Sequence, residues 1–209
     1  MIVIVPFSQS GFSYEELLKL IHESFQERLD QGLEFTCSAM TVEQFKVRMK
    51  DGVVFVAVDS SSQSLIGTLS CHLFMGKSIH GYIEYLAIRP DYKRQGVGTL
   101  LYNEIERFAL DKKASYFESD TAVRAKSSVR WHIDLGFKII GLNSYSSTNY
   151  YSYIFRKQLS SKCSIWDSTF FCYFHFFVSS LYVILLKRKD GRLSILGRAV
   201  KKVYQFLRS

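Results

Sequence analysis

The part of this sequence best suited to chemistry is Lys93–Thr99, which reads Lys-Arg-Gln-Gly-Val-Gly-Thr and runs directly into an amphipathic helix. Gly96 and Gly98 let the backbone approach a ligand closely because neither carries a Cβ atom. Unpaired amides at a helix start attract anions, and the helix dipole strengthens that attraction. Lys93 and Arg94 add positive charge beside them. The combination predicts a cradle for a diphosphate group.

Two common phosphate-binding motifs do not match this spacing. A dinucleotide-binding fold needs a third glycine at position 101, which is occupied by Leu101. A P-loop needs Gly-Lys followed by Ser or Thr, and the stretch lacks that run. Taken alone, the two glycines also fit a plain turn that happens to precede a helix.

The apolar pattern predicts the elements that position this loop. Ser13 and the run Thr41-Val-Glu-Gln44 are typical helix starts, and Gly136 suits the residue after a helix. The predicted strands are 2–5, 53–58, 65–74, 81–88, 116–121, 137–142 and 150–158. The predicted helices are 14–29, 42–49, one through Leu101, Ile105 and Phe108, and 126–135. This order mixes hairpins with crossovers, so we expect an α/β protein with a mixed sheet.

With its neighbours, the loop resembles a known family. The stretch Tyr82–Leu101 resembles motif A of the GNAT (GCN5-related N-acetyltransferase) superfamily, where Arg/Gln-x-x-Gly-x-Gly/Ala follows the fourth strand and holds the CoA pyrophosphate. Lys93 stands where the family prefers Arg or Gln. Ser128–Phe137 resembles the family's helix that ends in Leu-Tyr-x-x-x-Gly-Phe. The resemblance covers residues 1–159 and implies the GNAT fold, a mixed and mostly antiparallel sheet flanked by helices, with residues 160–209 as a C-terminal helical extension.

The resemblance also implies a cosubstrate and its binding residues. In this family the fourth and fifth strands splay apart, and the pantetheine arm of acetyl-CoA pairs with the backbone of the fourth strand. Ala125 stands where the family's helix often begins with Asn, and Ser127 or Ser128 is expected to replace the lost hydrogen bond. The residues expected to hold acetyl-CoA are Leu86, Ala87, Ile88, Lys93, Arg94, Gln95, Gly96, Val97, Gly98, Thr99 and Ser128.

Acetyl transfer to an amine needs a base for the amine proton and an acid for the leaving thiolate. Glu84 is the candidate base, on the face shared by Tyr82 and Leu86 if the strand has no bulge. The alternative for Glu84 is a solvated carboxylate at a strand edge. His132 stands where the family has its acidic Tyr, and an imidazolium can donate a proton. The alternative for His132 is packing on its helix.

We therefore expect an acyl-CoA N-acyltransferase that moves acetyl from acetyl-CoA directly to a primary amine of a small molecule or peptide. The alternative is a CoA-binding regulatory or scaffolding module whose catalysis has decayed, which His132 and Ala125 favour. No metal is expected, because the four cysteines lie in no CxxC spacing and near no histidine cluster. The cysteine pattern is also typical of a reducing cytoplasm.

The basic charge of the chain lies in its tail. The chain as a whole carries a net charge of +8. Residues 1–159 carry 18 Lys and Arg against 17 Asp and Glu, whereas residues 160–209 carry 9 against 2. This partition argues against nucleic-acid binding by the main domain. It also separates an expected N-acetyltransferase domain, residues 1–159, from an extension, residues 160–209.

The extension is apolar and then basic. Residues 169–186 carry no formal charge. Their length, 18 residues, is at the lower limit for a membrane span. After the basic run 187–189, basic residues stand among an apolar stripe at helical spacing, which is typical of a helix lying on anionic lipid. The stripe is Leu193, Leu196, Val200, Val203, Tyr204 and Leu207. We expect residues 169–209 to contact an anionic membrane surface, with the protein in the cytoplasm at the inner face. The alternative is packing of the aromatic run against the domain or against a second subunit in a homodimer.

Overall fold

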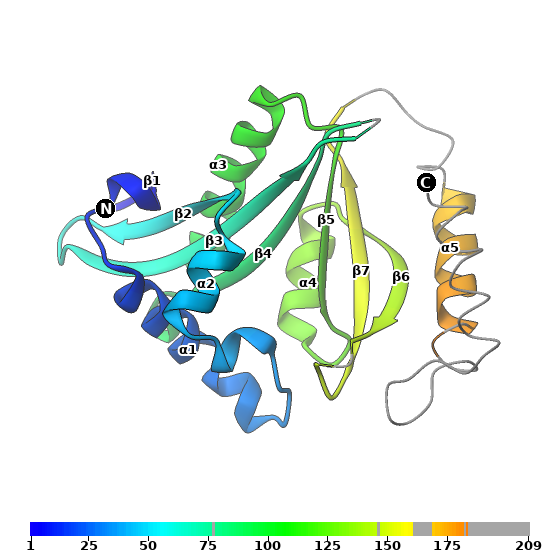
Figure 1. Cartoon of the computed structure of the whole chain (residues 1–209), viewed down its shortest axis with the longest axis horizontal. Helices are drawn as coiled ribbons and strands as arrows, with labels where there is room; N and C mark the ends of the chain where they lie inside the picture. Colours follow the sequence, from blue (N-terminus) through cyan, green and yellow to red (C-terminus); the bar gives the residue numbers. More distant parts are fainter. Residues whose placement is uncertain (77, 146, 161–168, 182, 184–209) are drawn as a thin grey trace. The chain divides into compact units, whose positions relative to one another are not determined.

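The computed structural model describes residues 1–76, 78–145, 147–160, 169–181 and 183 of the 209-residue chain. The strands are β1 (Ile2–Pro6), β2 (Gly52–Asp59), β3 (Ser64–Phe74), β4 (His80–Ile88), β5 (Tyr116–Ala122), β6 (Lys138–Ser144) and β7 (Tyr151–Gln158). The helices are α1 (Tyr14–Asp30), α2 (Val42–Arg48), α3 (Val97–Asp111), α4 (Lys126–Asp134) and α5 (Thr169–Leu181) (Figure 1). Three short 3-10 helices in the described residues are labelled η1 (Phe7–Gln9), η2 (Thr36–Ala39) and η3 (Pro90–Tyr92).

In the described part of the chain, the sheet has seven strands in the order β1-β2-β3-β4-β5-β7-β6. The pairs β1–β2, β2–β3, β3–β4 and β6–β7 are antiparallel, and the pair β4–β5 is parallel. The predicted α/β class and the mixed, mostly antiparallel sheet are confirmed. The three 3-10 helices have no counterpart in the sequence prediction.

The contacts of the chain divide it into two compact units. Unit 1 comprises residues 1–119 and 158–161, and unit 2 comprises residues 120–157 and 162–209. The division falls inside β5 and assigns the tail to the same unit as α4, β6 and β7. It follows packing, whereas the boundary predicted at residue 159 follows composition and family resemblance, so that boundary stays a prediction.

Unit 1 packs helices on both faces of β1–β4 (Figure 1). Because β2 alternates its side chains, Val54 and Val56 join a core with Leu17 of α1 and Phe45 of α2. On the other face, the ring of Phe55 meets the ring of Phe108 of α3, with centroids 6.2 Å apart. The predicted caps at Ser13 and Thr41 both form complete capping boxes. The sheet is therefore held rigidly beneath the loop that leads into α3.

Unit 2 contains the helix that the sequence places in the tail. On α5, Ser179 Oγ accepts a hydrogen bond from the Leu142 amide of β6 at 2.9 Å. The ring of Phe176 lies 6.3 Å from that of Tyr153 of β7. Thus part of the aromatic run packs on the strands of its own unit. Among the described residues, no helix combines the length and apolarity needed to cross a membrane. The basic helix predicted within 187–209 lies outside the described residues.

Candidate active site

The loop between β4 and α3 is built by two backbone turns in the left-handed region. η3 ends at Tyr92, Arg94 has φ +61°, and Gly96 has φ +81° and caps α3 without a side-chain bond. An L residue pays a steric cost at such a φ, whereas Gly does not. A Cβ atom placed on Gly96 would meet nothing within 4 Å. Gly96 is therefore needed for the turn, and the space beside it is open.

The backbone amides of this loop are available to a ligand. In the part of the chain that the structure describes, the amides from Arg94 to Gly98 donate no hydrogen bond, and the first internal bonds of α3 run from Thr99 and Leu100 to the Gly96 carbonyl. Successive free amides at a helix start form an anion site that the helix dipole reinforces. The geometry fits the diphosphate that the sequence predicts here, although the ligand contacts themselves stay a prediction.

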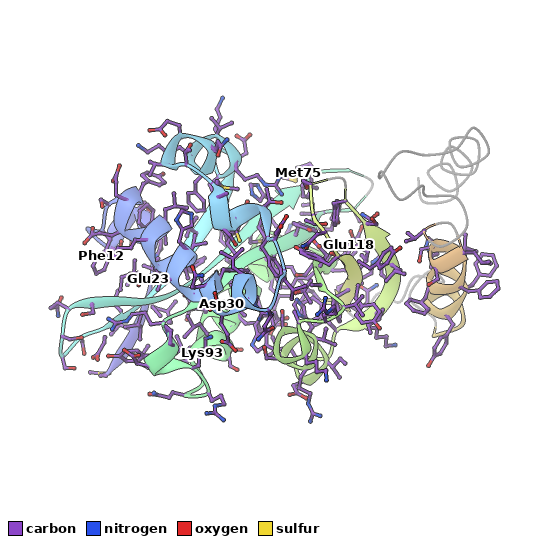
Figure 2. All side chains as sticks on the ribbon, turned by 90° about the horizontal axis from the view of Figure 1, so that it is seen from below. Phe12, Glu23, Asp30, Met75, Lys93 and Glu118 are labelled. Atoms are coloured by element: carbon purple, nitrogen blue, oxygen red, sulfur yellow. The ribbon has the colours of Figure 1, made fainter. Side chains whose placement is uncertain are left out.

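Lys93 and Gln95 connect the loop to neighbouring elements. Lys93, labelled in Figure 2, places its Nζ 2.6 Å from Glu27 Oε2 of α1. This bond lowers the pKa of Glu27, with the charge of Lys93 contributing as well. Gln95 donates from Nε2 to the Asp91 carbonyl at 2.7 Å, which ties the loop to η3. Lys93 therefore has a carboxylate partner here and must exchange it to contact a phosphate.

β4 contains a bulge that the sequence does not reveal. Ser70 of β3 lies opposite Glu84, whereas Thr68 lies opposite Ala87, so β4 has one extra residue between these pairs. Tyr85 absorbs the irregularity with φ +58°. The bulge resets the alternation of side chains, and Glu84 and Tyr85 both contact α2. Glu84 therefore does not share a face with Leu86 by simple alternation, because the condition attached to that prediction, an unbulged strand, is not met.

Beyond the bulge, the edge of β4 is available for pairing. β4 and β5 pair only from His80–Tyr82 to Tyr116–Glu118, so the remainder of β4 makes no ladder with β5 in the described residues. Ala87 is 2% exposed and belongs to the core against α1 and α2, while Ile88 lies opposite Gly67. The backbone of Leu86, Ala87 and Ile88 is thus held from one side by β3. Its pairing with pantetheine stays a prediction.

Glu84 lies in a cluster of charged side chains. Its Oε2 accepts from Arg48 Nη2 at 2.8 Å and its Oε1 accepts from Arg48 Nε at 3.2 Å. His72 Nε2 lies 3.0 Å from Oε1, at ion-pair distance but not aligned as a hydrogen bond. The Glu84 side chain is only 12% exposed. It is therefore not a solvated edge carboxylate, which was the alternative to a base.

Sequence reasoning missed Arg48 and His72. Arg48 lies in the last turn of α2, 36 positions before Glu84, and no local pattern joins the two. His72 lies opposite Tyr82, so it is a diagonal neighbour of Glu84 across the β3–β4 ladder. A correct strand register could have identified His72. Arg48 could be found only from the packing of α2 on the sheet.

His132 of α4 has the surroundings of a packing residue. It is 4% exposed, and its ring stacks on Phe155 at 4.4 Å between centroids. Nδ1 lies 2.7 Å from the Ser128 carbonyl and donates to it. Burial lowers the pKa of His132 to about 4, although the bond to Ser128 opposes that shift. The imidazole is therefore neutral at neutral pH, which favours the packing alternative over an imidazolium acid.

The start of α4 also differs from the family pattern. Ala125 caps the helix with no side-chain hydrogen bond. The Ser128 carbonyl accepts from His132, while binding of CoA by the Ser128 side chain stays a prediction. Among the described residues, no three His, Cys, Asp or Glu side chains lie close enough together to hold a metal ion.

Comparison with known proteins agrees with the loop and the fold. Residues 14–137 match the sequence model of the Acetyltransferase (GNAT) family. The chain belongs to the GNAT acetyltransferase family. None of the curated protein sequences is similar enough to count as a relative.

Solved structures of the same fold are distant in sequence. A GNAT-family acetyltransferase from Staphylococcus aureus Mu50 is 15% identical, with a TM-score of 0.61, and the match covers 77% of this chain and all of that one. NAA60 of Arabidopsis thaliana in complex with a bisubstrate analogue is 17% identical, with a TM-score of 0.59 and coverage of 77% and 100%. An aminoglycoside 6'-N-acetyltransferase complexed with coenzyme A is 12% identical, with a TM-score of 0.56 and coverage of 78% and 99%.

Proposed function

We propose that this protein transfers the acetyl group of acetyl-CoA directly to a primary amine, with Glu84 accepting the amine proton. The observation that carries the proposal is the loop Arg94–Gly98, whose free amides lie beside open space at Gly96. The same strand that leads into this loop carries Glu84. Diphosphate binding and proton acceptance are thus supplied by one continuous segment of unit 1.

The reaction balances with these groups. The amine nitrogen attacks the thioester carbon, a C–N bond forms, and the C–S bond breaks. The acceptor binds as an ammonium, so one proton passes to the Glu84 carboxylate before the attack and frees the nitrogen lone pair. After the attack the nitrogen loses a second proton to water, and the thiolate of CoA leaves. A thiol has a pKa of about 8.5, so the thiolate can leave and take its proton from water without a side-chain acid. A neutral His132 is compatible with this route.

A covalent acyl-cysteine route is disfavoured for the described cysteines. Cys37 and Cys71 are both buried, and burial raises the pKa of each thiol to about 12. The charge of Glu84 raises both further. Because the thiolate is the nucleophilic form, neither side chain is activated at neutral pH. This supports direct transfer in a ternary complex.

The Arg48 guanidinium must move away before Glu84 can act as a base, because Arg48 donates hydrogen bonds to both carboxylate oxygens of Glu84. The Arg48 side chain is 54% exposed and extends from the last turn of α2, whereas Glu84 is anchored in β4. An approaching ammonium can therefore displace the guanidinium toward solvent, with one cation exchanged for another. The exchange leaves no unpaired charge at Glu84.

Release of free thiol from acetyl-CoA, measured over a panel of amines, tests the proposal. Because the structural neighbours include an aminoglycoside acetyltransferase, the panel contains aminoglycosides. It also contains peptides with free N-termini, amino sugars, polyamines and amino acids. With the best acceptor, Glu84→Gln should lower kcat by on the order of 10²-fold, the usual contribution of a general base. CoA binding, followed by thermal shift, should be unchanged.

Two matched variants separate a base from a structural ion pair. Glu104→Gln removes a half-buried carboxylate that pairs with Arg107 on α3, and its kcat should equal that of the native chain. Arg48→Met removes the pair but leaves the carboxylate, so kcat should be retained. An Arg48→Met loss as large as that of Glu84→Gln would assign the pair to structure alone. Binding of CoA without turnover of any amine would instead favour the regulatory module.

A further inference from the structure

The two compact units carry opposite net charge. Unit 1 has 12 Lys and Arg against 15 Asp and Glu, whereas unit 2 has 15 against 4. The acidic unit contains the loop and Glu84, and the basic unit contains α4, α5 and the tail. A local excess of positive charge attracts polyanionic surfaces over a Debye length. Unit 2 therefore has the charge of a docking unit.

α5 presents an apolar face that its own unit does not cover. Tyr173 is 72% exposed, Phe174 50%, Phe177 63% and Leu181 39%. Spacings of three, four and eight residues place these side chains on one face of a helix. Figure 1 shows α5 as the orange helix. A helix face that gathers Phe and Leu in this way is typical of helices whose apolar face is buried at a membrane–water interface.

The opposite face of α5 is fixed to the strands. Ser179 is 5% exposed, accepts from the Leu142 amide at 2.9 Å and donates to the Phe176 carbonyl at 3.0 Å. Its Oγ also lies 3.3 Å from where a Cβ on Gly141 would stand, so Gly141 permits the close approach of β6 and α5. A helix packed along one side in this way offers only its outer face, which suits contact with a surface.

We propose that unit 2 docks on an anionic lipid surface through the outer face of α5, defined here as Tyr173, Phe174, Phe177 and Leu181. The chain that follows supports lipid as the occupant. Residues 187–209 carry eight Lys and Arg against one Asp. Each basic residue near an anionic bilayer contributes about 1 kcal/mol. Apolar insertion and electrostatic attraction then act on adjacent segments, the two signals that stable peripheral binding needs.

Other occupants fit the outer face less well. A nucleic acid needs cations among the aromatic side chains to contact its phosphates, and α5 carries no Lys or Arg. A second copy would bring a second unit with a net charge of +11 to the same face, and like charges repel. Lipid satisfies both the apolar face and the basic sequence. The docked protein would lie on the cytoplasmic side, where acetyl-CoA is found.

Flotation of the full-length protein with lipid vesicles tests this proposal. The vesicles are phosphatidylcholine alone or phosphatidylcholine mixed with phosphatidylglycerol, at low and high salt. The protein should float with the anionic vesicles. Phe174→Ser with Phe177→Ser should lower its partition coefficient onto them about tenfold or more, since burial of one Phe is worth that factor. The matched control is Met75→Ser with Leu110→Ser, two exposed apolar positions in unit 1, which should float as the native chain does.

Several outcomes would overturn the proposal. Native protein that stays in the soluble fraction with both vesicle types would exclude lipid docking. A Phe174, Phe177 double variant that floats normally would show that the outer face is covered by another part of the chain. Binding of a single-stranded oligonucleotide in place of vesicles would assign the basic charge to nucleic acid. A variant that changes only the oligomeric state in light scattering would make the face a subunit contact. None of these outcomes bears on CoA binding by unit 1.

Discussion

At the scale of single residues, the role of Glu84 is set by its partners from two other elements. The bond to Glu84 raises the pKa of Arg48, with burial opposing and the charge of Glu84 adding to the shift. Burial, with the Glu84 charge as the next contribution, raises the pKa of Tyr85, so that phenol stays protonated beside it. Glu84 is therefore the anionic centre of its neighbourhood. In the proposed reaction, a cationic acceptor enters a site already built to hold a positive charge.

His132 makes stability depend on pH in a direction that can be stated. Its folded-state pKa is about 4, below the ordinary value of 6.5. The unfolded chain therefore binds more protons as pH falls below 6.5, and stability contributed by the neutral imidazole is lost toward pH 4. The full loss is roughly 3 kcal/mol. Above pH 6.5 the contribution is complete.

We therefore predict that His132→Phe flattens the pH dependence of unfolding. Urea denaturation of the native chain should give a lower free energy of unfolding at pH 4.5 than at pH 7, and the variant should show a smaller difference. At pH 7 its kcat should change little, because a buried neutral ring that contacts Phe155 is a packing group. A pH-dependent loss of kcat with unaltered stability would restore His132 as the acid.

At the scale of elements, the packing of α3 on the sheet fixes the position of the loop that precedes it. Val97, Leu101, Ile105 and Ala109 recur every four residues and bury one face of α3. Gly67 of β3 allows this contact, since a Cβ there would lie 3.2 Å from both Val97 and Leu101. The first turn of α3 is thus packed firmly against the sheet, and this packing holds the backbone amides of Arg94–Gly98 in place. Preorganisation of this kind favours binding because little ordering remains to be done.

Gly96→Ala is predicted to separate backbone strain from ligand binding. The added methyl group meets no atom in the structure, so the cost to the ligand-free protein is only the left-handed φ, about 1 kcal/mol. Gly11→Ala is the matched control, because Gly11 has φ +77° and equally open surroundings. Both variants should unfold at similar, slightly lower temperatures. Only Gly96→Ala should lose part of the stabilisation that CoA gives the native chain.

If both variants gained the same stabilisation from CoA, the loop would not be the diphosphate site. Gly96→Glu extends the series, because it adds negative charge where a diphosphate is expected. It should abolish the CoA-induced shift altogether.

Local patterns predicted most elements but not the bulge. The N-cap at Ser13, the capping box at Thr41 and Gly136 as the residue after α4 depend on neighbours within a few residues, and all three predictions are confirmed. The bulge at Tyr85 depends on how β4 registers with β3, and the Glu84–Arg48 pair depends on where α2 packs. Long-range packing therefore determined what the sequence could not show. The site residues named for CoA stay predictions, since no bound ligand tests them.

At the scale of the whole molecule, the two compact units differ in net charge. The net charge of +8 is the sum of an acidic unit 1 and a strongly basic unit 2. The bulk value alone suggests a uniformly basic protein, whereas the positive charge is concentrated in unit 2. Ser179 and Phe176 fix α5 to the strands of unit 2, so this helix is part of a folded unit as well as an addition to the family domain.

Ending the chain after Ser161 should separate these two roles. The loop and Glu84 lie in unit 1, whose residues are all retained, so CoA should still raise the unfolding temperature. Unit 2 loses α5, which leaves the Leu142 amide without the Ser179 acceptor and uncovers the strands that Phe176 contacts. Water can reach the Leu142 amide once α5 is gone, so the loss of stability comes mainly from the apolar surface that is uncovered. The shortened chain should therefore unfold at a lower temperature without ligand, bind an apolar dye and fail to float with anionic vesicles.

Ser179→Ala in the full chain is the matched control, with a smaller loss of stability and normal flotation. A shortened chain as stable as the native one would mean that α5 contributes nothing to the fold of unit 2, and its loss of CoA binding would show that unit 1 does not hold the site by itself.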